Sequence, residues 1–195
     1  MDRCAKTKIT WRRMTKDNIS NDYFEKLKSV SLQEDADIYG SSLWEEWHEL
    51  ADIQHEPAKE FFIERLQDVR SDWRAVSISL LGFHYSLEQD VLDQIRKLLF
   101  SDPDPSVRIA ATSVLGHQSK LPEKSLVQAL IHDSKPLVRE AAFSALLELA
   151  DVPYKIRLDE LEKIDSGEIR PTLDQVKRIL VECQKNASII NMMKE

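Results

Sequence analysis

Apolar side chains recur every three or four residues along much of this chain, which is the spacing of one face of an α-helix. In the first such stripe the apolar residues are Phe61, Phe62, Leu66 and Val69. Several stripes follow a proline, which suits the first turn of a helix because its missing N–H has no partner there. We expect amphipathic helices over Pro57–Val69, Leu87–Phe100, Pro122–His132 and Pro153–Ile164.

A second kind of segment alternates with these stripes and repeats in sequence. Each copy has an aspartate six residues before an arginine, followed by small and apolar residues at helical spacing. The three clear copies begin with Asp68–Arg74, Asp102–Arg108 and Asp133–Arg139, so that the arginines are 34 and 31 residues apart. A weaker fourth copy begins at Pro171, with apolar Leu173, Val176 and Leu180 in the matching positions.

Together the two patterns predict an all-α chain in which a unit of helix, short turn and helix occurs about four times. We place the units at residues 57–85, 88–117, 122–150 and 153–185, in a domain over residues 57–195 that ends in a partly apolar tail. One unit cannot bury its apolar face alone, whereas stacked units form a continuous core.

This pattern resembles HEAT repeats, especially the short variety of phycobilin-lyase-type proteins. The residues that carry the resemblance are the three Asp/Arg pairs above, together with Val107, Val138, Ala110, Ala111, Ala141 and Ala142. The resemblance implies a right-handed α-solenoid in which the aspartates and arginines of successive repeats form ion pairs. We call this series of ion pairs the ladder. In the fourth copy Glu168 and Asp174 replace the aspartate and the arginine, so we expect the ladder to end before that copy, as in a terminal cap.

Residues 1–56 lie outside the clear repeats and predict a basic segment followed by an N-terminal helical cap. We expect one short helix that starts at Ser20 or Asn21 and another that contains Leu43, Trp44 and Trp47.

Charge is unevenly distributed along the chain, whose formal net charge is −7. Residues 29–72 contain twelve acidic and three basic side chains. Clustered negative charge attracts basic proteins and repels nucleic acid phosphates, although it is also typical of a solvated helix face. The acidic residues of this block include Glu34, Asp35, Asp37, Glu45, Glu46, Glu49, Asp52, Glu56, Glu60 and Glu64.

Candidate chemistry is sparse. His48, Asp52 and His55 are spaced to share one helix face, but no second segment supplies further ligands, so we expect no metal and no cofactor. The dipeptides His48-Glu49 and His55-Glu56 resemble the iron-binding dyads of deoxyhypusine hydroxylases, which are HEAT-like, yet that family places its dyads in separate repeats.

Other enzyme classes find little support. HEAT-like DNA glycosylases need a basic channel and aromatics around a carboxylate, and Trp73 beside Asp72 aligns with core positions. Nothing marks the bilin pocket of a lyase. The sequence has no glycine-rich phosphate loop, and Cys4 and Cys183 have no signature of a nucleophile. We therefore expect no enzymatic activity, no nucleic acid and no small-molecule substrate.

Lone thiols suit a reducing compartment, and the sequence has neither a secretory signal nor an apolar run of membrane-spanning length. We expect a cytoplasmic protein without a membrane partner.

An unexpected apolar stripe lies on the second helices of the repeats, on the side away from the aligned core positions. It is either a set of anchors for a partner or a surface that a neighbouring helix covers. Its members are Ile78, Ile109, Phe143 and Leu147.

The resulting functional prediction is a non-enzymatic protein-binding module. Its finer form is an acidic inhibitor or immunity protein that occludes a basic, nuclease-like toxin, since HEAT-like folds occur among immunity proteins; the alternatives are a scaffold or adaptor and, further away, a HEAT-like glycosylase or lyase. The predicted partner-binding residues are Glu45, Glu46, Glu49, Asp52, Glu56 and the four residues of the apolar stripe.

Overall fold

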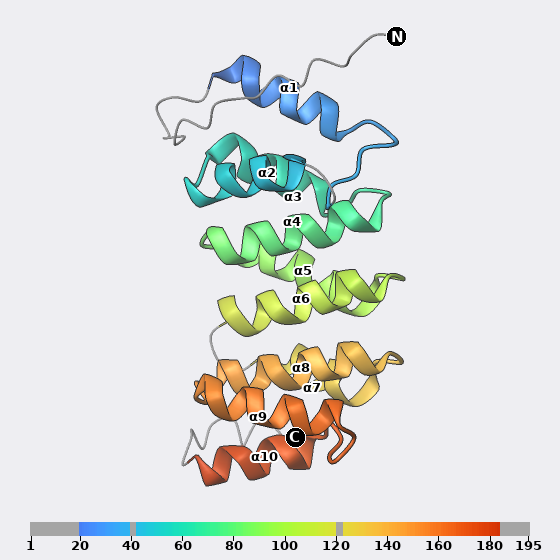
Figure 1. Cartoon of the computed structure of the whole chain (residues 1–195), viewed down its shortest axis with the longest axis vertical. Helices are drawn as coiled ribbons and strands as arrows, with labels where there is room; N and C mark the ends of the chain where they lie inside the picture. Colours follow the sequence, from blue (N-terminus) through green and yellow to red (C-terminus); the bar gives the residue numbers. More distant parts are fainter. Residues whose placement is uncertain (1–19, 40–41, 120–122, 184–195) are drawn as a thin grey trace, which may run out of the picture. The chain divides into compact units, whose positions relative to one another are not determined.

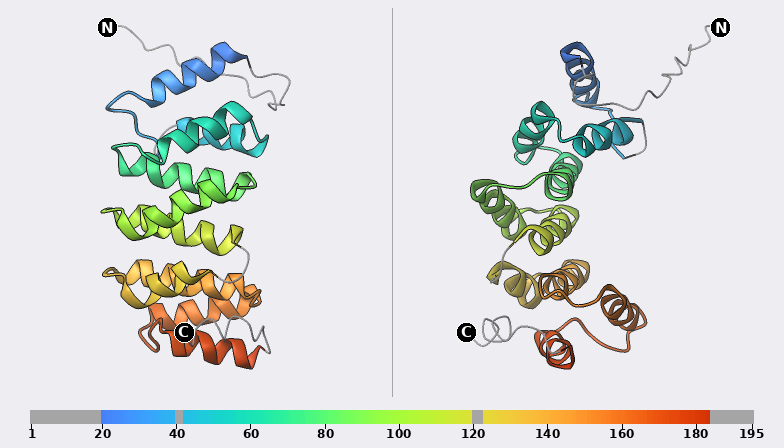
Figure 2. Two further views of the ribbon diagram at one scale, coloured as in Figure 1. Left: turned by 180° about the vertical axis from the view of Figure 1, so that it is seen from behind. Right: turned by 90° about the vertical axis from the view of Figure 1, so that its left-hand side faces the viewer.

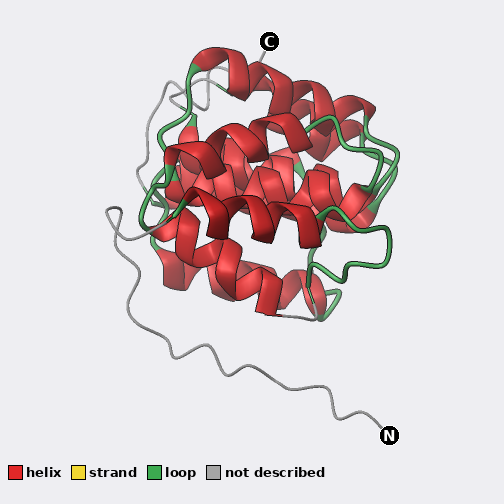
Figure 3. Cartoon of the chain, turned by 90° about the horizontal axis from the view of Figure 1, so that it is seen from above, coloured by secondary structure: helices red, strands yellow, loops and turns green. Residues whose placement is uncertain are grey.

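The computed structural model describes residues 20–39, 42–119 and 123–183, and these residues form ten α-helices and no strand (Figures 1 and 3). The predicted all-α architecture is confirmed. The basic segment 1–19 and the apolar tail 184–195 lie outside the described residues. The helices are α1 (Asn21–Ser31), α2 (Ser42–Asp52), α3 (Glu56–Arg65), α4 (Ser71–His84), α5 (Gln89–Ser101), α6 (Pro105–Gln118), α7 (Lys124–His132), α8 (Pro136–Leu149), α9 (Tyr154–Asp165) and α10 (Leu173–Glu182).

The chain divides into two compact units, Met1–Ala58 and Lys59–Glu195. Within the described residues, none of the helices has the length and the apolar character that crossing a lipid bilayer requires.

The first unit is organised around Trp47 of α2, which is fully buried. Its indole Nε1 donates a hydrogen bond to the Ser31 hydroxyl at the end of α1 (2.9 Å), and its ring meets Phe24 edge to face. Helix α1 starts where the sequence predicts, because the Ser20 hydroxyl accepts a hydrogen bond from the backbone N–H of Tyr23.

The second unit contains helix pairs in which each second helix packs on the next. Helices α4, α6 and α8 follow one another in direct contact, and α5 and α7 lie beside them (Figure 2). Short loops, of three residues between α5 and α6 and between α7 and α8, keep each pair antiparallel.

Bidentate ion pairs join consecutive pairs of helices. Arg74 of α4 donates from Nε and Nη2 to the Asp102 carboxylate (2.6 and 2.9 Å), and Arg108 of α6 does the same to Asp133 (2.7 and 3.0 Å). In each case Nη1 also donates to a backbone carbonyl of the arginine's own loop, that of Asp68 (2.8 Å) or Asp102 (2.9 Å). One guanidinium therefore closes its own loop and binds the following one.

Burial would raise the pKa of Asp133, yet the hydrogen bonds from Arg108 and from the Lys135 N–H hold it below the ordinary value. Arg108 itself is only 8% exposed.

A second set of ion pairs joins the first helices. Lys59 of α3 donates to Glu88 before α5 (3.1 Å), and Arg96 of α5 donates to Glu123 before α7 (2.7 Å). The Glu123 carboxylate is buried and also accepts from two serine hydroxyls, those of Ser119 and Ser125.

The fourth pair is held differently. Its buried Glu160, on α9, accepts hydrogen bonds from Lys163 (2.6 Å), from Gln175 of α10 (2.8 Å) and from Arg178 of α10 (3.2 Å). The loop between α9 and α10 has seven residues instead of three, and Glu168 within it is exposed. Each Arg–Asp ion pair between successive repeats is one rung of the ladder. Among the described residues no carboxylate forms such a pair with Arg139, so the ladder ends where the sequence predicts.

Three members of the predicted apolar stripe belong to the core, so that of the two alternatives a neighbouring helix covers them, and their assignment as partner-binding anchors is wrong. Ile78, Phe143 and Leu147 are fully buried, and Ile109 is half-buried. The reason is the direct stacking of α4, α6 and α8, which turns this side of each helix toward its neighbour.

Glycines mark that stacking contact. A Cβ atom placed on Gly82 would collide with the Val114 side chain, and one placed on Gly116 would lie 2.7 Å from Cβ and 2.9 Å from Cα of Ala145. These two glycines let successive second helices approach closely.

The first stripe also differs from expectation at its end. Helix α3 stops at Arg65, and Val69 is 95% exposed in the following loop. The backbone of this loop is held in place by Arg74, whose Nη1 donates a hydrogen bond to the carbonyl of Val69 (3.1 Å).

We expect Arg108→Ala to lower the free energy of unfolding by about 3 kcal/mol, because it leaves the Asp133 carboxylate without its bidentate partner in a largely buried place. Urea denaturation measures the loss. Lys177→Ala is the control, since its ion pair with Asp174 is long (3.9 Å) and the Asp174 side chain is 96% exposed. Similar losses in both variants would contradict the structural role of the rung.

Gly116→Ala tests the close stacking of α6 on α8. Helix propensity alone would make this change stabilising by about 1 kcal/mol. We expect instead a destabilisation of about 1–3 kcal/mol, because the added methyl group meets the backbone of Ala145. Thermal unfolding decides the sign, with Ser113→Ala on the same helix as a control that should change stability little; a stabilised Gly116→Ala variant would refute the contact.

Candidate functional site

The candidate site is the solvent side of α2, in the first unit. Leu43, Trp47, Leu50 and Ala51 bury the other side of this helix. The remaining positions include four members of the acidic cluster that the sequence singles out, so burial of one face leaves carboxylates on the rest of the helix.

A shallow depression of about 380 Å³ lies on this solvent side. Its aromatic wall comes from Trp44 and His48, whose ring centroids are 4.6 Å apart, and Tyr39 approaches Trp44 at 5.9 Å. Its acidic lining comes from Glu45, Glu49 and Asp52. Glu45 and Asp52 are exposed, and Glu49 is half-buried.

Glu46 points elsewhere. Its carboxylate accepts a hydrogen bond from the hydroxyl of Tyr23 on α1 (3.2 Å), which makes it a link between the two helices. Burial raises the pKa of the Glu46 carboxyl; the hydrogen bond from Tyr23 opposes this, and the other glutamates of α2 raise it further. The pKa of Tyr23 is raised by burial and by the Glu46 charge.

Glu56 is exposed at the start of α3 and does not line the depression. Of the five acidic residues predicted for partner binding, the structure thus brings together Glu45, Glu49 and Asp52.

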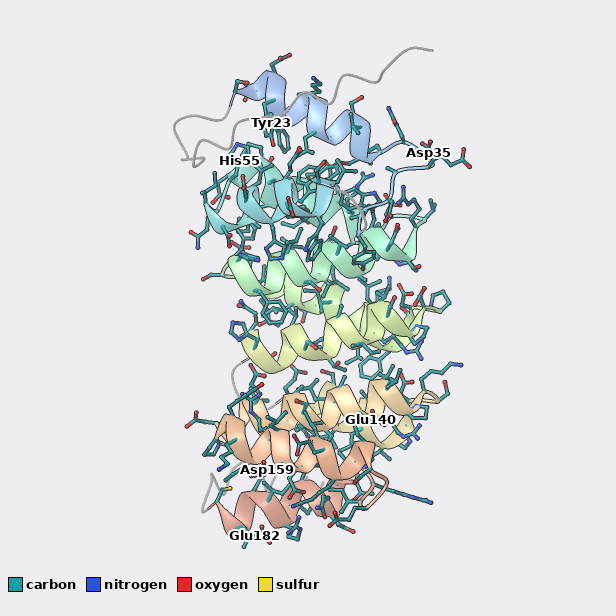
Figure 4. The ribbon with its side chains drawn as sticks, viewed as in Figure 1. Tyr23, Asp35, His55, Glu140, Asp159 and Glu182 are labelled. Carbon is teal, nitrogen blue, oxygen red and sulfur yellow. The ribbon has the colours of Figure 1, made fainter. Side chains whose placement is uncertain are left out.

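The expectation that His48, Asp52 and His55 share one helix face is wrong. Helix α2 ends at Asp52, and Gln54 has a left-handed backbone (φ 52°) that turns the chain away. His55 lies after this turn, with its ring 5.3 Å from that of Phe24, and burial lowers the pKa of its imidazole. Figure 4 labels Tyr23 and His55 in this unit.

The part of the site that sequence reasoning missed is its aromatic wall. The spacing of four residues between Trp44 and His48 places them one turn apart on the same side of the helix, and that spacing was the available signal.

Chemically, the site offers carboxylates beside an aromatic wall. Such a surface binds ammonium and guanidinium groups, because carboxylates pair with the charge and the indole face attracts cations.

Comparison with known proteins places the repeats in a family. The model of HEAT repeats matches residues 59–147 and 92–167, which together cover more than half of the 195 residues. The chain belongs to the HEAT-repeat family. No curated protein and no solved structure matches it. HEAT repeats present extended surfaces to other proteins, and this protein is accordingly a candidate protein-interaction scaffold.

We expect Glu46→Gln to stabilise the protein at pH 7, by about 1–2 °C in Tm for a half-exposed charge. The raised pKa of Glu46 means that the folded state favours the protonated form, so its contribution to stability is present below the ordinary glutamate pKa of about 4.3 and is lost as the pH rises through the folded value.

Thermal melts at pH 7 and pH 4 test this, since the difference between Glu46→Gln and the parent should shrink at the lower pH. Glu25→Gln, an exposed change on α1, serves as control. A variant that melts lower than the parent at pH 7 would show that the charged carboxylate is needed for the link to Tyr23.

Proposed function

We propose that this HEAT-repeat protein is a non-enzymatic binding module that docks a basic segment of a partner protein on the acidic face of α2. The observation that carries the proposal is the convergence of Glu45, Glu49 and Asp52 around the Trp44–His48 wall.

The physical case rests on complementarity in both charge and shape. Exposed carboxylates steer a basic partner and raise its rate of association, although each contact in water contributes little to affinity. A Lys or Arg stem can lie along the Trp44 ring while its charged end reaches the carboxylates, so the aromatic wall adds contact area to the charge pairing.

The finer proposal concerns the class of partner. Nucleases bind phosphates through a basic cleft, and an acidic helix face competes for the same cations. The HEAT-repeat protein would then act as an inhibitor or immunity protein that occludes a nuclease-like toxin. Its support is charge complementarity and analogy with other HEAT-like inhibitors. A scaffold or adaptor would use the same face without blocking an activity.

Charge reversal on α2 tests the docking face. We expect Glu45→Lys/Glu49→Lys to weaken binding of the basic partner more than tenfold, because it turns attraction into repulsion. The matched control is Glu60→Lys/Glu64→Lys on α3, which makes the same change in net charge at two exposed glutamates.

The measurement is capture of partners from lysate of the source cells by the parent and both variants, followed by titration of the captured protein. Equal affinity for all three would remove the docking proposal. Nuclease activity of the captured protein, assayed with and without the HEAT-repeat protein, then separates inhibitor from adaptor: lost activity supports occlusion, and unchanged activity contradicts it.

A further inference from the structure

The break in the Arg–Asp ladder leaves a pocket of about 720 Å³ in the second unit, between the adjoining ends of α7 and α8 and the α9–α10 loop. Its polar lining residues include Arg139, Arg170 and Glu140, the last of which Figure 4 labels on α8. Its apolar walls are Leu130, Ile131, Pro136, Ile164, Ile169, Pro171 and Leu173.

The same chain contains a counterpart of this pocket one repeat earlier, in which an aspartate already binds the arginine. That counterpart has about 410 Å³ and is lined by Leu99, Phe100 and Arg108, which precede Leu130, Ile131 and Arg139 by 31 residues. In the counterpart the Asp133 carboxylate binds the Nε–Nη2 edge of Arg108. The larger pocket has the arginine without the aspartate.

The orientation of Arg139 is set in the same way as that of Arg108. Its Nη1 donates to the carbonyl of Asp133 (2.8 Å), as Arg108 donates to the carbonyl of Asp102 (2.9 Å). Among the residues that the structure describes, no carboxylate binds the remaining edge of Arg139, and Arg170 forms no ion pair. Two guanidinium groups outnumber the single Glu140 carboxylate, so the pocket favours an anionic group.

We propose that this pocket binds an aspartate-containing turn of a partner protein, whose carboxylate takes the place of the missing rung at Arg139. A peptide segment is favoured over a small free acid because both filled rungs are formed by such a turn. Apolar pairs, Leu99-Phe100 and Leu130-Ile131, precede the aspartates of those rungs by two and three residues, and the walls around Arg139 suit an apolar neighbour of the acid. This site is independent of the acidic face of α2.

The probe is a capped nonapeptide with the sequence of residues 99–107, Leu-Phe-Ser-Asp-Pro-Asp-Pro-Ser-Val, titrated into the full-length protein. Methyl resonances of Ile131, Ile164 and Ile169 report on the pocket. We expect saturable shifts with a Kd of about 1 mM or tighter. The peptide with Asp102→Asn should bind at least tenfold more weakly, since it loses the charged bidentate contact. This peptide pair requires no change in the protein.

Protein variants locate the contact. Arg139→Gln should weaken binding of the parent peptide at least tenfold, Arg170→Gln about threefold or less, and Lys97→Gln, an exposed change on α5, should leave it unchanged. The α2 charge reversal should also leave it unchanged, which separates failure of this proposal from failure of the proposed function.

Three outcomes would overturn the proposal. The first is no binding, or equal binding of the two peptides. The second is chemical shift changes at Leu99 instead of at the three isoleucines. Leu99 lines the counterpart pocket, where Asp133 already binds Arg108, so binding there would not depend on a missing carboxylate. The third is acetate binding as tightly as the peptide, which would assign the pocket to a small carboxylate.

Discussion

The stacked helices depend on one interaction, the double use of each ladder arginine. A guanidinium that binds the carbonyl of its own loop through Nη1 has its Nε–Nη2 edge fixed in direction. The aspartate of the next repeat then has one place to bind, so closure of a loop and the register of the following pair become coupled. Side-chain burial strengthens the coupling, because the Arg108 and Asp133 side chains are only 10% and 9% exposed and water competes poorly for them. Apolar burial drives stacking, and the rungs select its register.

The same logic explains why the fourth pair is different. Helix α9 has Pro153 at its N-cap, where α5 and α7 have Glu88 and Glu123, so the ladder of the first helices stops at the same junction as the arginine ladder. The fourth pair compensates internally through Glu160 and is joined to α8 by Arg157, which donates to Glu148 at 2.7 Å. A terminal repeat that is held by other contacts need not fill the space beside Arg139, and the pocket follows from that freedom.

The sequence predicts those features that recur in several repeats, and it does not predict those that depend on which helix packs against which. Three Asp/Arg copies at nearly equal spacing predicted the helix pairs and the end of the ladder, because each copy constrains the others. Ile78 and Phe143 were assigned to a surface because helical periodicity shows that a helix has two apolar sides without showing what covers the second. The glycines at positions 82 and 116 were the missed signal of close stacking. The turn at Gln54 has no such signal, since glutamine is not a residue that typically favours a left-handed backbone.

The acidic face and the arginine pocket would contribute differently to recognition, and the difference follows from exposure. Glu45 and Asp52 are exposed, so their attraction acts at a distance, is screened by salt and mainly raises the rate of encounter. The fork of Arg139 lies among apolar walls, where a carboxylate must lose water to enter and its contact acts only at short range. Such a contact slows dissociation and discriminates aspartate from asparagine, because the neutral amide cannot offer two acceptors to one guanidinium edge. The exposed carboxylates of α2 would therefore act on the capture of a basic partner, and the Arg139 pocket would act on how long a bound carboxylate is retained.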